Sequence, residues 1–206
     1  MKQYTKWMSY FRPTLYIGLF LLLLLQACKP YQYKGSYIID PPPAADFNLV
    51  RAEGGRLRLS DLKGKIVLLF FGFATCPDVC PTTLSDAKQI LSELEDEKEN
   101  ITYLFITVDP ERDTPQVLDA YVSQFHENII ALTGTEEELE AVRKDYGIYA
   151  AKVPLSKSAI NYTMEHTARV YLIDNKGNLR LTYTYGTPYE DILQDIRQIL
   201  KETKDQ

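Results

Sequence analysis

Two cysteines near the middle of the chain, Cys76 and Cys80, are the residues whose type and spacing best fit chemistry. They follow the apolar run 66–71, which has the length and the β-branched and aromatic content of a buried strand. If a helix begins beside them, residues four apart lie on one helix face, about 6 Å apart along the axis. Two thiols at that separation can form a disulfide or hold a soft metal ion between them.

The N-terminal residues predict an export signal. Three cations precede the uncharged apolar stretch 14–25, which is shorter than the ~20 residues needed to span a bilayer. The stretch ends at Leu25-Gln26-Ala27-Cys28, which is similar to the lipobox of bacterial lipoproteins. That resemblance implies cleavage before a lipidated Cys28, with the rest of the chain in the periplasm or outside the cytoplasmic membrane. The alternative is a non-lipidated signal anchor in which Cys28 is buried.

The charge balance excludes one class of partner. The 206 residues contain 23 Lys and Arg against 28 Asp and Glu, and loss of residues 1–27 removes three cations and no anion. An acidic chain without a cluster of basic residues is not a nucleic-acid-binding protein. It suits a cationic ligand or a basic partner, although acidity also serves solubility. With Cys28 carrying lipid, only Cys76 and Cys80 remain as thiols in a compartment where thiols oxidise.

Three parts of the chain are expected: a lipoprotein-type signal peptide over 1–28, a tether over 29–46, and a domain over 47–206. The tether contains Pro41-Pro42-Pro43 and is expected to be extended, holding the domain away from a membrane. Hydrophobic periodicity and turn residues predict an N-terminal hairpin of 47–49 and 56–59, further strands at 66–71, 101–108, 129–132, 170–173 and 179–185, and helices at 81–97, 115–125, 136–146 and 189–201. This order implies an α/β domain with a mixed sheet covered by helices on both faces.

Several segments carry a resemblance to a known family. They are Gly72-Phe73-Ala74-Thr75-Cys76-Pro77-Asp78-Val79-Cys80-Pro81, Val108-Asp109-Pro110-Glu111-Arg112-Asp113-Thr114-Pro115, Leu132-Thr133-Gly134, and His166-Thr167-Ala168 before Tyr171-Leu172-Ile173-Asp174. The order of elements resembles the thioredoxin fold, and the motifs resemble the Sco (SenC) family. The resemblance implies a membrane-tethered copper-binding protein that assists assembly of the copper A centre of cytochrome c oxidase. Its partners would be the copper-receiving oxidase subunit and other copper or thiol-redox assembly factors.

The resemblance also implies a copper site made of Cys76, Cys80 and His166. Thiolates select Cu(I), whereas an added imidazole broadens a site toward Cu(II), so this donor set fits both oxidation states. His126 lies in no matching motif and is interpreted as a structural or surface residue. Met164 is an additional soft ligand or, by default, a packing residue.

Charged residues around the site have less specific roles. Asp78, between the thiols, is expected to disfavour the thiolate form unless a cation is bound. Asp109, Arg112 and Asp113 match the family motif and either order the thiol loop or contact a partner, the alternative being a solvated charged turn. The stretch from Tyr162 to Glu165 lacks strong periodicity and is interpreted as a mobile loop that closes over the metal.

Other functions compete for the same cysteines. A thiol–disulfide reductase that keeps a partner's cysteines reduced needs Cys76 and Cys80 but not His166. Many thioredoxin-fold reductases have a two-residue spacing and a cis-proline before the hairpin, whereas this chain has three residues and Thr167-Ala168 there. A plain stabilising disulfide would close a very short loop and contribute little stability. A peroxiredoxin-type peroxidase would need a Pro-x-x-x-Thr-x-x-Cys setting, which the sequence lacks. The chain is therefore expected to be a binding and transfer protein rather than an enzyme.

Overall fold

The computed structural model describes residues 30–155 and 161–204, and the compact unit that carries the cysteines begins at Tyr33. Its centre is an eight-stranded mixed sheet with the strand order β1-β10-β9-β4-β5-β6-β2-β3. The strands are β1 (Ser36–Tyr37), β2 (Asn48–Arg51), β3 (Arg56–Arg58), β4 (Ile66–Gly72), β5 (Ile101–Thr107), β6 (Ile129–Thr133), β9 (Arg169–Ile173) and β10 (Leu179–Thr184). β4, β5 and β6 are parallel, and the other neighbours are antiparallel.

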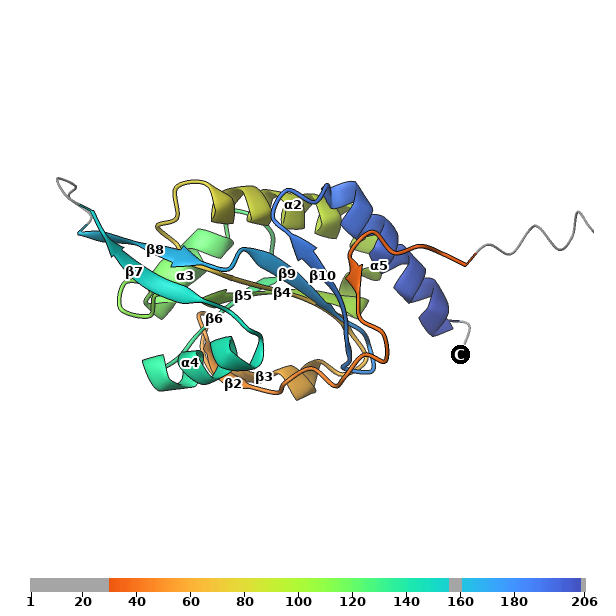
Figure 1. Cartoon of the computed structure of the whole chain (residues 1–206), viewed down its shortest axis with the longest axis horizontal. Coiled ribbons are helices and arrows are strands. Elements are labelled where there is room, and N and C mark those ends of the chain that lie inside the picture. Colours follow the sequence, from red (N-terminus) through yellow and green to blue (C-terminus); the bar gives the residue numbers. More distant parts are fainter. Residues whose placement is uncertain (1–29, 156–160, 205–206) are drawn as a thin grey trace, which may run out of the picture. The chain divides into compact units, whose positions relative to one another are not determined.

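Helices cover both faces of this sheet. They are α2 (Val79–Glu93), α3 (Pro115–Val122), α4 (Glu136–Asp145) and α5 (Tyr189–Lys204), with short 3-10 turns at Leu59–Leu62 and Glu95–Asn100. α2 and α5 pack together on one face, and α4 lies on the other (Figure 1). β4 and β5 are buried at every residue, as expected for central strands covered on both sides. The expected α/β class is therefore confirmed.

The helix starts follow from local chemistry that the sequence shows directly. Thr114 caps α3 by accepting a hydrogen bond from the Val117 N–H, with Pro115 at the first helical position. Thr135 caps α4, and the Glu138 carboxylate accepts a hydrogen bond from the Thr135 N–H at 2.9 Å. The predicted helix 81–97 is shifted: α2 begins at Val79 and ends at Glu93, so Cys80 lies in its first turn.

A second, two-stranded sheet was not predicted. β7 (Ala150–Pro154) and β8 (Tyr162–His166) pair antiparallel, and they project as a ribbon beyond the main sheet (Figure 1). The expected loop at residues 162–165 is therefore wrong, because these residues form a strand. Alternate residues of a strand face the same side, so Tyr162, Met164 and His166 share one face of the ribbon.

The expected tether also differs from the structure. Ser36 and Tyr37 pair with β10, and Pro43 forms an isolated bridge with Asn178. The N–H groups of Lys34 and Gly35 donate to the buried carboxylate of Asp195 at 2.9–3.0 Å. The segment from residue 33 onward thus belongs to the folded domain. The expected signal peptide lies outside the described residues, among which no helix is long and apolar enough to cross a membrane.

Candidate metal centre

The end of β4 delivers the two cysteines to the N-terminal end of α2. A close approach is built in at Gly72, where an added Cβ would lie 2.7 Å from the Phe105 ring and 2.9 Å from the Cys80 Sγ. The loop after it turns with the Cys76 N–H donating to the Phe73 carbonyl at 3.2 Å. Cys76 is half-buried, Cys80 is fully buried, and both are free thiols.

Backbone N–H groups at the start of α2 face the sulfur of Cys76. The Cys80 N–H donates to the Cys76 Sγ at 3.4 Å. The first N–H groups of a helix have no partner within the helix and carry a partial positive charge. Cys76 is therefore placed where its thiolate is stabilised.

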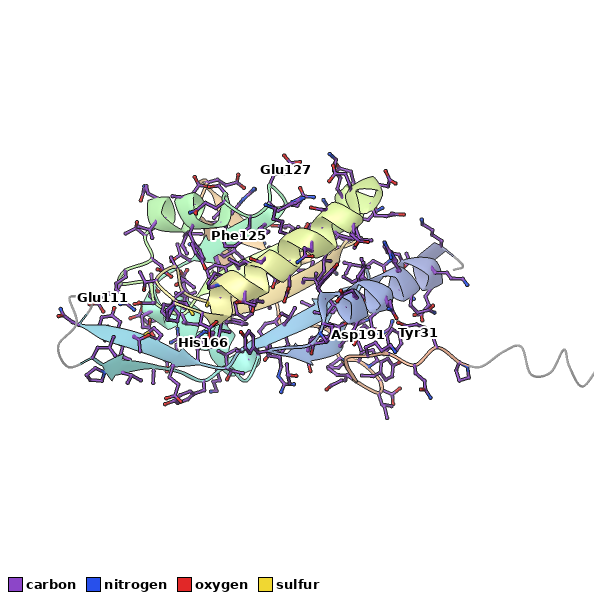
Figure 2. All side chains as sticks on the ribbon, turned by 90° about the horizontal axis from the view of Figure 1, so that it is seen from above. Tyr31, Glu111, Phe125, Glu127, His166 and Asp191 are labelled. Carbon is purple, nitrogen blue, oxygen red and sulfur yellow. The ribbon has the colours of Figure 1, made fainter. Side chains whose placement is uncertain are left out.

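His166 comes from the end of β8 and reaches the buried thiol. Its Nε2 lies 3.8 Å from the Cys80 Sγ, and its Nδ1 lies 3.2 Å from the Thr167 carbonyl oxygen. A proton on Nδ1 would donate to that carbonyl and leave the Nε2 lone pair free for a metal ion, whereas a proton on Nε2 would donate to a cysteine sulfur. The rings of Phe70 and Phe73 contact the imidazole edge-on. Figure 2 shows His166 beside the N-terminal end of α2.

The two thiols titrate very differently. A hydrogen bond from Cys80 lowers the pKa of Cys76 to about 4, opposed by burial and helped by His166 and by the backbone N–H of Asp78. The same hydrogen bond and burial raise the pKa of Cys80. The pair therefore holds one proton on Cys80 and a thiolate on Cys76. The expected effect of Asp78 is corrected: its exposed carboxylate does not dominate, and its backbone N–H favours the thiolate.

The acidic residues after β5 are buried, so the solvated-turn interpretation is wrong. Asp113 is 0% exposed and Asp109 is 1% exposed. The Asp113 carboxylate accepts hydrogen bonds from the Thr107 hydroxyl at 2.6 Å and from the Ala74 N–H at 3.1 Å. Thr107 in turn accepts from the Asp109 N–H at 2.9 Å. Asp113 thus holds the thiol loop in place at Ala74, two residues before Cys76.

Asp109 attaches the histidine-bearing ribbon to the same turn. Its carboxylate pairs with Arg112 and accepts from the Tyr162 hydroxyl at 2.9 Å. The Arg112 guanidinium lies 3.8 Å from the centre of the Tyr162 ring and donates to the Tyr162 carbonyl at 2.8 Å. Lys152 lies 4.7 Å from that ring centre and pairs with Glu111. We call this group of five residues the ribbon clasp.

The comparisons with known proteins place the chain in a family. The SCO1/SenC family model matches residues 40–201. This chain belongs to the SCO1/SenC family. A SCO2-like protein of Rickettsia felis is 38% identical over 146 residues, which cover 70% of this chain and 71% of the relative.

Solved structures of the family share the thioredoxin-like fold of this chain. A copper-bound Bradyrhizobium japonicum ScoI is 35% identical, with a TM-score of 0.70 over 77% of this chain and 99% of that one. A SCO1/SenC family lipoprotein from Bacillus anthracis is 28% identical, with a TM-score of 0.68 over 79% and 99%. BsSco, described as a cytochrome c oxidase assembly protein with a disulfide switch, is 25% identical, with a TM-score of 0.61 over 79% and 96%.

The remaining candidate ligands lie as follows in this SCO1/SenC domain. Met164 packs against the core and lines a cavity of ≈ 580 Å³ beside Asp109. The Nδ1 of His126 accepts from the Asn128 N–H at 3.1 Å, which agrees with a structural role. In the described part of the chain, no three His, Cys, Asp or Glu side chains already surround a point that could hold a metal ion.

Proposed function

We propose that this chain binds copper through Cys76, Cys80 and His166 and delivers it to the copper-receiving subunit of cytochrome c oxidase. The observation that carries the proposal is the 3.8 Å separation of the Cys80 Sγ and the His166 Nε2. Sulfur and imidazole donors bind transition metals at roughly 2.3 and 2.0 Å, so two of them on one ion lie roughly 3.5–3.7 Å apart. The pair is therefore already near the spacing of two donors that share an ion.

The third donor would come from Cys76. Hydrogen bonding with the Cys80 and His166 side chains lowers the pKa of its thiol, so its half-buried sulfur lies beside the other two donors. Copper would supply the charge that makes loss of the Cys80 proton favourable. Two soft sulfurs suit Cu(I), and the imidazole extends the site to Cu(II). A family member solved with copper bound, Bradyrhizobium japonicum ScoI, and the oxidase assembly protein BsSco support this cargo and destination.

A thiol–disulfide reductase is the second candidate. It is favoured by the asymmetry of the pair, since a low-pKa, half-buried Cys76 can attack a partner's disulfide and Cys80 can resolve the mixed disulfide. Such a reaction needs no imidazole ligand, so His166 distinguishes the two functions.

Replacing His166 with alanine is expected to leave thiol–disulfide exchange and much of the Cu(I) affinity intact. The variant should lose the intense thiolate-to-Cu(II) absorption and bind Cu(II) far more weakly, because Cu(II) prefers the imidazole that has been removed. Cu(II) titration followed by visible absorption and electron paramagnetic resonance measures this, beside a disulfide-reduction assay. His126→Ala is the matched control and should bind like wild type. Unchanged Cu(II) spectra in His166→Ala would place the reductase first.

We further propose that Cys28 carries the lipid that attaches the protein to a membrane. The Leu25-Gln26-Ala27-Cys28 sequence supports this, as does the lipoprotein description of the Bacillus anthracis relative. Because the chain packs onto the domain from residue 33, only residues 29–32 would separate the lipid from the fold.

Cys28→Ala is expected to release the protein from the membrane fraction, or to leave it as an unprocessed precursor. Stable anchoring needs more than one lipid chain, and the substitution removes the sulfur that would carry them. Cell fractionation and the mass of the N-terminal peptide measure the outcome. A processed Cys28→Ala protein that stays as firmly bound as wild type would exclude lipidation as the anchor.

A further inference from the structure

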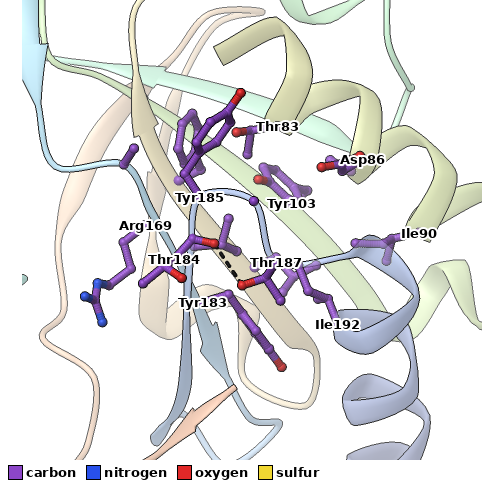
Figure 3. A pocket seen from close by; sticks show the side chains of 16 residues that line it. Thr83, Asp86, Ile90, Tyr103, Arg169, Tyr183, Thr184, Tyr185, Thr187 and Ile192 are labelled. Atoms are coloured by element: carbon purple, nitrogen blue, oxygen red, sulfur yellow. Dashed lines mark hydrogen bonds between the residues drawn. The ribbon is translucent and has the colours of Figure 1, made fainter. Parts of the chain in front are cut away.

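A small cavity lies on the α2 face, directly beside the proposed copper ligands. It has a volume of ≈ 20 Å³ and lies between α2, β5, β10 and the loop before α5. Thr83, three residues after Cys80, and Ala168, two residues after His166, both line it. Figure 3 shows Thr83, Asp86 and Tyr103 gathered next to α2.

The polar groups around this cavity are mainly acceptors. The Thr83 and Thr187 hydroxyls donate to the carbonyls of Val79 and Thr184 at 2.8 and 2.9 Å, which leaves their lone pairs available. The Arg169 guanidinium donates to the Thr182 hydroxyl and points away from the cavity (Figure 3). A ligand that enters must therefore donate hydrogen bonds.

Tyr103 is an independent sign that a polar partner is missing from the cavity. Its side chain is 1% exposed, and among the described residues its buried hydroxyl has no hydrogen-bond partner. A buried polar group without a partner costs free energy, and native structures contain few of them. A polar ligand group within reach of the Tyr103 hydroxyl would lower that cost.

The cavity wall also carries a carboxylate, that of Asp86. Asp86 forms no ion pair among the described residues, and burial together with the nearby Glu190 raises its pKa. Tyr185, which is 48% exposed, also lines the cavity, and an aromatic ring can bind a cation. A water molecule could fill the space but would not balance this charge.

We propose that this cavity receives the ammonium group of a lysine from the partner protein. An ammonium is compact, positively charged and carries three donors, whereas a planar guanidinium is too large for a space that holds about one or two waters. The inference rests on the proposed delivery function, since Thr83 and Ala168 in the cavity wall lie three and two residues from Cys80 and His166 along the chain. Specificity would then come from a basic residue near the partner's copper ligands.

The test uses n-butylammonium as a lysine side-chain mimic on the metal-free protein, followed by amide chemical shifts. We expect saturable shifts at Thr83, Asp86, Tyr103 and Thr187 that n-butanol does not produce. Asp86→Asn and Tyr103→Phe should each weaken binding about tenfold, as expected for losing a hydrogen bond to a charged group. Asp119→Asn, on the exposed side of α3, is the matched control and should bind like wild type.

Equal shifts with n-butanol, or binding unchanged in Asp86→Asn, would overturn the proposal and assign the cavity to ordered water only. Melting temperatures of each variant separate a binding defect from unfolding. Because no copper is present, a negative result here leaves the copper site untouched. A positive result would also stand if the Cu(II) titration of His166→Ala failed.

Discussion

Iodoacetamide at pH 6 is expected to alkylate Cys76 about 100-fold faster than Cys80 in the reduced, metal-free protein. At this pH the Cys76 sulfur is a thiolate, because its pKa is lowered to about 4 by the hydrogen bond from Cys80. Cys80 keeps its proton, and its side chain is 0% exposed. Both the ionisation and the access of the reagent therefore favour the outer sulfur.

Timed quenching followed by mass spectrometry of the cysteine peptides measures the two rates. The rate at Cys76 should stay nearly constant down to about pH 5 and fall only as the thiolate protonates below that. In guanidinium chloride the two cysteines should react at equal rates, since the helix start and the burial are lost. His166→Ala should shift the Cys76 profile upward in pH. Equal rates in the folded protein would contradict the thiolate assignment that the copper proposal uses.

The central elements could be predicted because their signals are local. β4 is a continuous apolar run, and Thr114 and Thr135 carry the side chains that cap a helix three residues ahead. The cysteine pair could be placed because it directly follows such a strand. Each of these features is determined by a few residues that are adjacent in the sequence.

The β7–β8 ribbon could not be predicted from the same kind of signal. Its residues are half-buried or exposed, so the hydrophobic alternation that marks a strand is weak. The residues that hold β8 in place are distant in sequence. Arg112 and Asp109 form hydrogen bonds with Tyr162 and lie 50 and 53 residues before it. The period-two spacing of Tyr162, Met164 and His166 was the one available clue.

The N-terminal segment differs from the predicted tether for a related reason. Proline-rich composition is typical of linkers, and no residue near position 34 in the sequence indicates a hydrogen-bond acceptor for its backbone. The acceptor for the Lys34 and Gly35 N–H groups is Asp195, about 160 residues away on α5. Similarly, Asp113 looks like a surface charge until its bonds to Thr107 and Ala74 are seen.

Asp113→Ala is expected to lower the free energy of unfolding by about 3 kcal/mol. The substitution leaves the buried Thr107 hydroxyl and the Ala74 N–H without their acceptor. It should also loosen the thiol loop and reduce the alkylation difference between Cys76 and Cys80. Urea unfolding measures the stability, with Asp119→Ala on the exposed side of α3 as the control that should change little. A stable Asp113→Ala protein would return this residue to a role in partner contact.

The pH dependence of stability tests the same carboxylate in a second way. Burial raises the pKa of Asp113 from 3.8 to about 6, against the lowering effect of its two hydrogen bonds. Between these values the folded protein holds a proton that the unfolded chain has released, so this group's contribution to stability falls as pH rises from about 4 to about 6. A shift of about two pKa units corresponds to a loss of about 3 kcal/mol across that window.

Asp113→Asn removes this titration while keeping an acceptor for the Ala74 N–H. Its stability relative to wild type should therefore rise between pH 4 and 6 and become constant above pH 7. Urea unfolding of both proteins across this range gives the difference directly. Parallel pH profiles for the two proteins would contradict this. They would mean that the carboxylate stays ionised across the range, because the hydrogen bonds from Thr107 and Ala74 stabilise the ionised form more than burial destabilises it.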